Sequence, residues 1–227
     1  MMIAPLTGLI AGAAHVWSGP DHLAAVAPLA VRQRSRSWLA GIRWGFGHSA
    51  GVVLVGWLSL GLRDVLPLES LSSWSERLVG VMLIGIGLWT LRAALRRDIH
   101  THEHEHDGEH HLHIHVHRHR ENHAHPSAHE RHLHAAFGIG TLHGLAGSSH
   151  LLGVLPALAF PTRAQALAYL VAYGLGTIFS MAAFSWMLGS VSRRWGGNSV
   201  KFYRGLLGAT AVAALVIGGA WLLTGGI

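Results

Sequence analysis

Residues 11–30 of the chain read AGAAHVWSGPDHLAAVAPLA, an apolar run that contains two histidines and one aspartate. Such groups are costly in a hydrophobic span, because a charged side chain at the bilayer centre costs about 2.5 to 3.5 kcal/mol even on the mildest scale. Ionisable residues inside a membrane segment are therefore read as functional by default. His15, Asp21 and His22 are the first candidates for a functional site.

The composition of the whole chain indicates an integral membrane protein. Half of its 227 residues are hydrophobic, 29 are glycine and only 12% are charged. The lack of cysteine excludes disulfides and thiolate metal sites. The formal charge of +6 could indicate nucleic acid, but the basic residues lie in short connections between apolar segments, where they act as topology signals. The lipid membrane is thus an expected partner, and nucleic acid is not.

Six apolar segments are long enough to cross a membrane. We predict that all six are helices, because backbone polar groups in lipid need partners within the protein. They cover residues 5–31, 39–61, 76–95, 134–158, 164–189 and 202–224. The predicted fold class is an all-α integral membrane protein with six transmembrane helices.

The basic residues predict how these six spans are oriented. With six spans, both termini and the connections 62–75 and 159–163 share one side of the membrane. That side carries three of the 17 Lys and Arg residues, and the other side carries the remaining fourteen. By the positive-inside rule the basic side is cytoplasmic and both termini face outward. The expected location is the inner (plasma) membrane, as a multi-pass protein.

A hydrophilic insert separates two halves of similar sequence. At a constant offset of 128 residues, the series His15, Gly19, His22, Pro28 recurs as His143, Gly147, His150, Pro156. Three spans per half make the second copy inverted in the membrane, as in many secondary transporters. The predicted organisation is a first three-helix repeat at 1–97, a cytoplasmic His-rich insert at 98–133 and a second three-helix repeat at 134–227.

The first and fourth helices are predicted to be broken. On an uninterrupted helix, His15 and His22 would lie roughly 10 Å apart along the axis, too far to share one ion. Ser18-Gly19-Pro20 stands between them, and proline removes a backbone donor and clashes with the preceding turn. Residues 144–149 form an equally breakable stretch of the second half. Broken helices at matching places of inverted halves are typical of a midplane binding site.

The polar side chains of these segments suit a transition-metal ion. Imidazole binds Ni, Zn, Cu and Fe, and a carboxylate compensates the charge of a divalent ion. A further histidine lies in the middle of the second segment. The predicted metal site comprises His15, Asp21, His22, His48, His143 and His150. The alternative is that some of these histidines only hydrogen-bond to neighbouring helices, as polar residues in bundles do.

The insert is dominated by histidine. Fifteen of the 20 histidines lie between residues 100 and 134, in strings such as HTHEHEHDGEHHLHIHVHRHR. No pattern in the insert could bury a core, so we expect it to be disordered. Because dense imidazoles bind transition metals, we expect it to buffer or sense metal. The alternative is a solvated tether between the halves.

Two apparent enzyme motifs do not support catalysis. Residues 102–106 fit HExxH, but a tract this rich in His and Glu matches without the helix that a metalloprotease needs. Residues 47–51 fit GxSxG within an apolar segment, whereas a nucleophile elbow needs a strand, a turn and a helix. An intramembrane hydrolase would also lack an identifiable nucleophile or acid/base pair. We do not expect an enzyme.

Three stretches together resemble the nickel/cobalt transporter superfamily: HVWSGPDHLAAVAPLA, WGFGHSAG and GTLHGLAGSSHLLGVLPALAFPT. The chain is most similar to the compact six-span, high-affinity nickel-transport family proteins. This resemblance implies a Ni²⁺ or Co²⁺ permease in which His15, Asp21, His22 and His48 are functional positions. The family's usual motif has four residues between the first His and the Asp-His pair, whereas this chain has five. His-rich inserts also resemble those of the related nickel/cobalt efflux branch, which leaves the direction open.

The leading hypothesis is a transporter that takes up Ni²⁺, or alternatively Co²⁺ or Zn²⁺, for nickel enzymes. The metal is the transported substrate, and no bound cofactor is expected. Efflux of excess nickel or cobalt is the close alternative. A membrane-anchored metal sensor or chaperone, working through the His-rich insert, is the rival from another class. Helices that only anchored the insert in the membrane would not need polar residues repeated in both halves, which favours transport.

Overall fold

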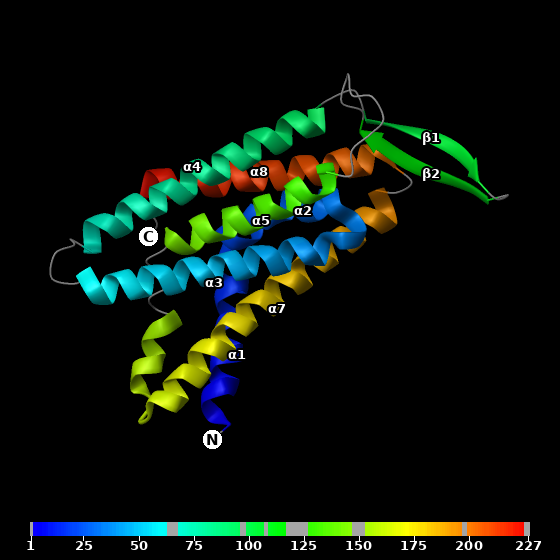
Figure 1. Ribbon diagram of the computed structural model, residues 1–227. Helices are drawn as coiled ribbons and strands as arrows, with labels where there is room; N and C mark the ends of the chain where they lie inside the picture. The colour runs from blue at the N-terminus through cyan, green and yellow to red at the C-terminus, as the bar shows by residue number, and fades with distance from the viewer. Residues whose placement is uncertain are drawn as a thin grey trace.

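The computed structural model describes residues 2–62, 68–95, 99–106, 109–116, 127–146, 153–196 and 199–224. Apart from one hairpin in the insert, its regular elements are helices (Figure 1). In chain order they are α1 (Ile3–Ser18), α2 (Pro20–Gln33), the 3-10 helix η1 (Arg34–Arg36), α3 (Ser37–Leu62), α4 (Leu68–Leu95), α5 (Ser127–Leu145), the 3-10 helix η2 (Leu155–Ala159), α7 (Arg163–Gly196) and α8 (Val200–Thr224). Each of the six predicted segments contains at least one of these helices.

Three helices in the described part of the chain are long and apolar enough to cross a membrane. They are Glu76–Leu95 within α4, and the whole of α7 and α8. Helix α1 is also apolar but has only 16 residues. A helical membrane protein is therefore confirmed, whereas the count of six spans stays a prediction.

The first predicted segment is broken where the sequence indicates. Helix α1 ends at Ser18, Gly19 is extended with φ −93° and ψ 94°, and α2 begins at Pro20. The Gly19 N–H donates to the carbonyl of His15 at 3.1 Å, and the His22 N–H donates to the carbonyl of Gly19 at 3.1 Å. Proline suits the first turn of α2, because its missing N–H would have no helical partner there. In the second half, α5 ends at Leu145, and residues 147–152 lie outside the described part.

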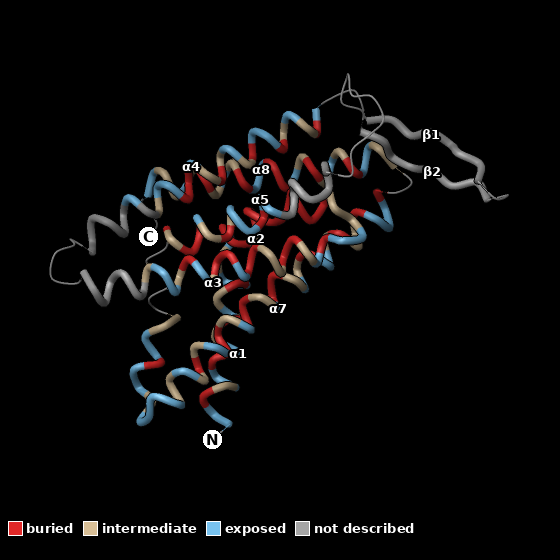
Figure 2. The backbone as a smooth tube through the Cα atoms, viewed as in Figure 1, coloured by how far each residue is buried: buried red, intermediate tan, exposed pale blue. Residues whose placement is uncertain are grey.

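The short helix α2 lies at the centre of the bundle. Residues 24–31 are all buried, so this part of α2 is covered on every side (Figure 2). Its neighbours are α3, α4, α7 and α8, together with α1 and α5. Alanines along α2 let these helices approach closely, and Ser192 of α7 donates a hydrogen bond to the carbonyl of Val31 at 2.9 Å. The residues after the break therefore form the core.

Helices from before and after the insert pair with one another. The most extensive pairs are α1 with α7, α3 with α5, and α4 with α8, and α3 also packs along α7. The set of pairs stays the same when each helix is replaced by its counterpart in the other half, that is, α1 by α5, α3 by α7, α4 by α8, and the reverse. The two parts of the chain thus share one core rather than forming two separate bundles.

Glycines mark the closest approaches, and these approaches are reciprocal. A Cβ on Gly12 of α1 would overlap the carbonyl oxygen of Tyr173 on α7, and one on Gly140 of α5 would overlap that of Trp44 on α3. These are matching positions of the repeated sequence. Backbone contacts of this kind need a residue without a side chain at the interface.

Two further pairs repeat the pattern. Gly47 of α3 lies against the Phe137 carbonyl of α5, as Gly176 of α7 lies against the Leu9 carbonyl of α1. Gly80 of α4 and Gly218 of α8 also lie against each other's carbonyl oxygen. Close glycine contacts therefore join the third helix pair as well.

Within the insert, the structure describes an antiparallel hairpin, whereas the composition predicts disorder. Strand β1 (Ile99–His106) pairs with β2 (Glu109–Val116), with Ile99 opposite Val116 (Figure 1). The alternation of histidine with other residues has the two-residue period of a strand, and Asp-Gly between the strands is a strong hairpin signal. Helix α5 begins at Ser127, so the expected boundary at residue 133 lies inside that helix.

The close contact at Gly140 predicts that Gly140→Ala destabilises the protein by about 1 to 3 kcal/mol, because the new methyl group overpacks α5 against α3. Gly138→Ala is the matched control, since a Cβ there meets nothing within 4 Å. Alanine favours helix over glycine by about 1 kcal/mol, so the control should be neutral or more stable. Thermal unfolding in detergent measures both. Equal midpoints for the two variants would contradict the packing described.

Candidate metal centre

Four helices bring five of the predicted ligands to one place. His15 lies in the last turn of α1, and Asp21 and His22 lie in the first turn of α2. His48 comes from α3, and His143 from the last turn of α5. The five side chains thus meet at the break between α1 and α2, next to α3, which precedes the insert, and α5, which follows it.

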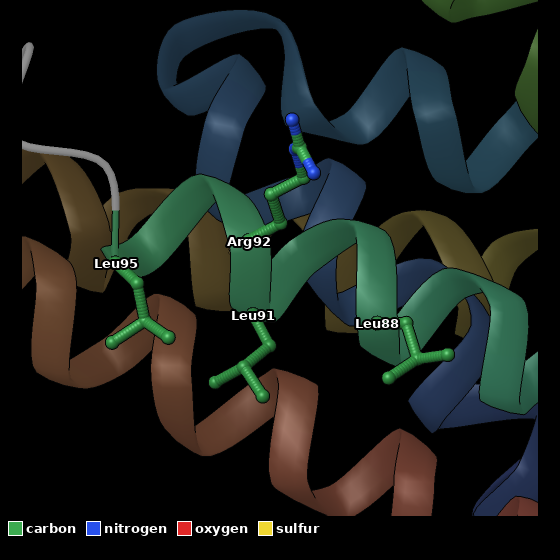
Figure 3. Close-up of a pocket in the computed structure, with 4 residues that line it drawn as sticks. All are labelled: Leu88, Leu91, Arg92 and Leu95. Carbon is green, nitrogen blue, oxygen red and sulfur yellow. The ribbon is translucent and has the colours of Figure 1, made fainter.

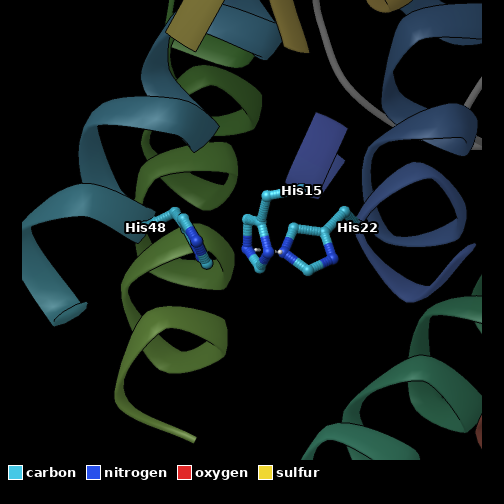
Figure 4. Close-up of side chains that lie close together, drawn as sticks. All are labelled: His15, His22 and His48. Atoms are coloured by element: carbon cyan, nitrogen blue, oxygen red, sulfur yellow. Dashed lines mark hydrogen bonds between the residues drawn. The ribbon is translucent and has the colours of Figure 1, made fainter. Parts of the chain in front are cut away.

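The break allows the two histidines of the first segment to meet. Nε2 of His15 and Nε2 of His22 are 2.9 Å apart, and the two rings meet edge to face (Figure 4). The ring centre of His48 is 5.7 Å from that of His15 and 5.1 Å from that of His22. On a continuous helix this arrangement would be excluded, because seven residues span roughly 10 Å.

Asp21 joins the second half of the chain to this cluster. Its Oδ1 is 2.9 Å from Nδ1 of His22, and its Oδ2 is 3.1 Å from Nε2 of His143. The Asp21 side chain is only 11% exposed, and a buried charge without such partners would be strongly destabilising. Its place in the first turn of α2 adds the favourable end of the helix dipole.

The hydrogen bonds fix the direction in which His22 faces. A carboxylate only accepts, so Nδ1 of His22 donates to Asp21, and Nε2 of a neutral His22 carries a lone pair toward His15. Metal-binding histidines are commonly oriented this way, with one nitrogen on a carboxylate and the other on the ion. The pair therefore presents a ready ligand atom to the space beside His15 and His48.

The donor atoms are spaced for metal coordination. Two groups have all their ligand atoms within 4.8 Å of one another, namely His15, His22, His48 and Asp21, His22, His143. With metal to nitrogen bonds of roughly 2.1 Å, two ligands at right angles stand roughly 3.0 Å apart and two tetrahedral ligands roughly 3.4 Å. The observed separations of 2.9 and 3.1 Å lie close to the first value. The set of imidazoles plus one carboxylate can hold a divalent transition metal.

Five of the six predicted site residues are therefore gathered in one cluster, and their role as metal ligands stays a prediction. Asp21, His22, His48 and His143 are buried, and His15 is partly exposed. His150 lies outside the described residues.

Two aromatic residues of the site were not predicted. Trp44 stacks on His48 with ring centres 4.9 Å apart and an interplanar angle of 11°, and its ring is 5.3 Å from that of His143. Tyr173 lies at the matching position of α7, with its ring 5.7 Å from that of His15. The similarity of WGFGH (residues 44–48) to YGLGT (residues 173–177) could have identified both residues. In each stretch the aromatic residue lies one helical turn before a residue on the buried face of the helix.

A separate pocket lies along α4, lined by Leu88, Leu91, Arg92 and Leu95 (Figure 3). Its leucines follow one face of the helix, and Arg92 points away from them. Three leucines and a guanidinium offer no ligand for a metal cation. This pocket is therefore not a candidate metal site, unlike the cluster at the helix break.

The fold and the cluster together define a multi-pass membrane protein with a buried His/Asp centre. Residues 6–219 match the family described as the cytochrome C biogenesis protein transmembrane region, and the chain belongs to this family. No solved structure is significantly similar to the chain. Membership of the nickel/cobalt transporter superfamily, expected from the motifs, stays a prediction.

Three curated proteins are similar to the chain. It is 36% identical to Chloroplast protein FOR GROWTH AND FERTILITY 1 of Arabidopsis thaliana over 82% of its length, and 32% identical to FOR GROWTH AND FERTILITY 2 over 93%. It spans about half of these relatives, 49% and 54% respectively. It is also 26% identical to the urease accessory protein UreH of Bacillus sp. (strain TB-90), over 93% of this chain and 86% of that protein.

Gly19 gives a test of the site's geometry. A Cβ on Gly19 would overlap Nδ1 of His22, while φ −93° and ψ 94° are open to alanine. Gly19→Ala should therefore displace the imidazole without straining the backbone, and weaken Co²⁺ binding by about tenfold or more. A titration followed by visible Co²⁺ absorption measures this. Gly85→Ala, where a Cβ meets nothing within 4 Å, is the control, and unchanged affinity in Gly19→Ala would contradict the geometry.

Proposed function

We propose that this protein transports Ni²⁺, with Co²⁺ as an alternative cargo, across the inner (plasma) membrane. The observation that carries the proposal is the buried cluster of one carboxylate and four imidazoles at the break between α1 and α2. Stability alone is a poor reason for such a cluster, because well-packed apolar residues often stabilise a core as well as a buried ion pair does. Binding of a metal cation would explain why these destabilising polar groups lie in the core.

The choice of metal rests on ligand chemistry and on the motifs. Imidazole and carboxylate donors suit Ni²⁺, Co²⁺ and Zn²⁺, and the sequence motifs of the first, second and fourth segments resemble those of nickel and cobalt transporters. The lack of cysteine argues against a soft-metal cargo such as Cu⁺. We assign the cluster to transport rather than to catalysis.

The proposed architecture is six spans in two inverted three-helix repeats. The reciprocal glycine contacts support it, because Gly12 against Tyr173 and Gly140 against Trp44 are the same contact seen from the two halves. A pseudo-two-fold axis in the membrane plane would produce this exchange. Under that symmetry, His15 and His143 are equivalent positions, and their ring centres lie 4.5 Å and 4.6 Å from that of His22.

Uptake is the proposed direction, and efflux is the alternative. The relative named as a urease accessory protein suggests a role in support of an enzyme, which suits supply of a metal better than removal of excess. The sensor or chaperone alternative would place the working ligands in the insert. The buried cluster favours transport over that alternative, since its ligands lie in the helical core rather than in the hairpin.

Asp21 provides the direct test of the proposal. Asp21→Asn keeps the size of the side chain but removes its charge, so uptake at low metal concentration should fall by about tenfold to a hundredfold, as expected for loss of the carboxylate partner of a metal-binding histidine. Ni²⁺ uptake by cells that express each variant measures this. Glu76→Gln is the matched control, because it makes the same change outside the cluster. Near-normal uptake by folded Asp21→Asn protein would sink the proposal.

The proposed topology has both termini outside and the insert in the cytoplasm. Arg32 lies over the ring of Trp89 at 4.3 Å and Arg34 over that of Tyr203 at 4.8 Å, an arrangement suited to the cytoplasmic membrane interface. We expect an impermeant thiol reagent to label a cysteine at residue 227 in intact cells, and not one at residue 110. The chain has no cysteine of its own to interfere. The reverse labelling pattern would invert the topology.

The hairpin is proposed to capture metal rather than to conduct it. A Gly/Ser linker in place of residues 99–116 should leave the transport rate within about twofold, because such a flexible connection lets both parts of the helical core assemble. Flux through the purified deletion variant in proteoliposomes is the measurement. If folded hairpin-free protein carries no metal, the histidine tract belongs to the pathway.

A further inference from the structure

The five donors of the cluster form two groups of three rather than one group of five. His15, His22 and His48 make one group, and Asp21, His22 and His143 make the other. His22 is the member that both groups share. This division is a property of the helix break, which places His15 on one side of the His22 ring and Asp21 on the other.

One ion cannot be bound by all five residues in this arrangement. With bonds of roughly 2.1 Å, even two ligands on opposite sides of an ion are only roughly 4.2 Å apart. Among the described residues, all ligand atoms lie within 4.8 Å of one another in each group of three, but not in the set of five. A single coordination sphere for all five residues would require the helices to move closer together.

His22 faces the two groups with different nitrogen atoms. Its Nε2 lies 2.9 Å from Nε2 of His15, and its Nδ1 lies 2.9 Å from Oδ1 of Asp21. An ion beside His15 would therefore use Nε2, with Asp21 holding the ring through Nδ1. An ion beside Asp21 would use Nδ1, and His143 would complete the group through its Nε2, which is 3.1 Å from Oδ2 of Asp21.

The two groups also differ in burial and in charge. His15 is partly exposed, so the first group is the more accessible, whereas all three members of the second are buried. The first group has three imidazoles, and the second contributes the carboxylate of Asp21. A divalent cation is therefore held more tightly in the second group, where its charge is partly compensated.

We infer that the transported ion occupies these two positions in turn, an outer His15–His22–His48 position and an inner Asp21–His22–His143 position, with His22 as the ligand that passes it between them. This inference rests on the proposed function. A neutral His22 has only one unprotonated nitrogen and so serves one position at a time, which limits the protein to one ion at a time. Transport needs both positions, whereas tight binding needs only the inner one.

The experiment compares binding with transport in His48→Asn, His143→Asn and His22→Asn, in purified full-length protein. Asparagine keeps a polar group at each place, and size-exclusion chromatography identifies folded variants. Co²⁺ binding is followed by its visible absorption and by equilibrium dialysis, and Co²⁺ flux is measured in proteoliposomes. His134→Asn, an exposed position on the same helix as His143, is the control.

The insert binds Co²⁺ of its own, so the core site is counted as the Co²⁺ that the unaltered protein binds in excess of His22→Asn, and this excess should be one ion per chain. We expect His48→Asn to keep the affinity for this ion within about threefold and its spectrum, yet to lose at least about tenfold in flux. His143→Asn should weaken its binding by about tenfold to a hundredfold and change the spectrum. Equal losses of affinity in His48→Asn and His143→Asn, or an excess of two Co²⁺ per chain, would overturn the two-position inference while leaving transport intact. Binding by the unaltered protein that does not exceed binding by folded His22→Asn would instead overturn the proposed function.

Discussion

The structure depends on one buried carboxylate, Asp21, held between the imidazoles of His22 and His143. Its charge is tolerated in the core only because both oxygens have partners, and removing one partner of a buried pair costs about 3 to 5 kcal/mol. The partners come from different parts of the chain, one from α2 and one from α5. The helix break, the central position of α2 and the contact of α5 with α3 are all needed to bring them together.

The glycines make that arrangement sterically feasible. A Cβ on Gly144 would overlap the backbone carbonyl of His48, so the helices that carry His48 and His143 can approach closely only because residue 144 has no side chain. At Gly19 the missing side chain leaves room for the ring of His22. The same small residues thus determine both how the helices pack and whether the ligands meet. Substitutions that look conservative, such as glycine to alanine, should therefore have functional effects.

Local sequence predicted the break and much of the cluster, since Gly19-Pro20 and the costly polar residues are visible without any tertiary information. The internal repeat added His143, because its position matches that of His15. Trp44 was missed because aromatic residues are common in apolar helices: the likeness of WGFGH to YGLGT marks its position, but only the structure shows its stacking on His48. The hairpin was missed because histidine-rich composition was taken as a sign of disorder, although the residues alternate with a strand's period. The start of α5 at Ser127 was missed for a similar reason, because its first turns are polar.

The central claim is that the cluster at the helix break carries a divalent metal ion through the membrane. Metal flux into proteoliposomes that contain only the purified protein, with a metal-sensitive dye inside, tests it most directly. Ni²⁺, Co²⁺, Zn²⁺ and Mn²⁺ should each be offered with and without a proton gradient. We predict saturable entry of Ni²⁺ or Co²⁺ that exceeds entry into protein-free vesicles, with Mn²⁺ excluded because it binds such nitrogen-rich sites most weakly of the four. Folded protein that admits none of the four ions under either condition would contradict this account.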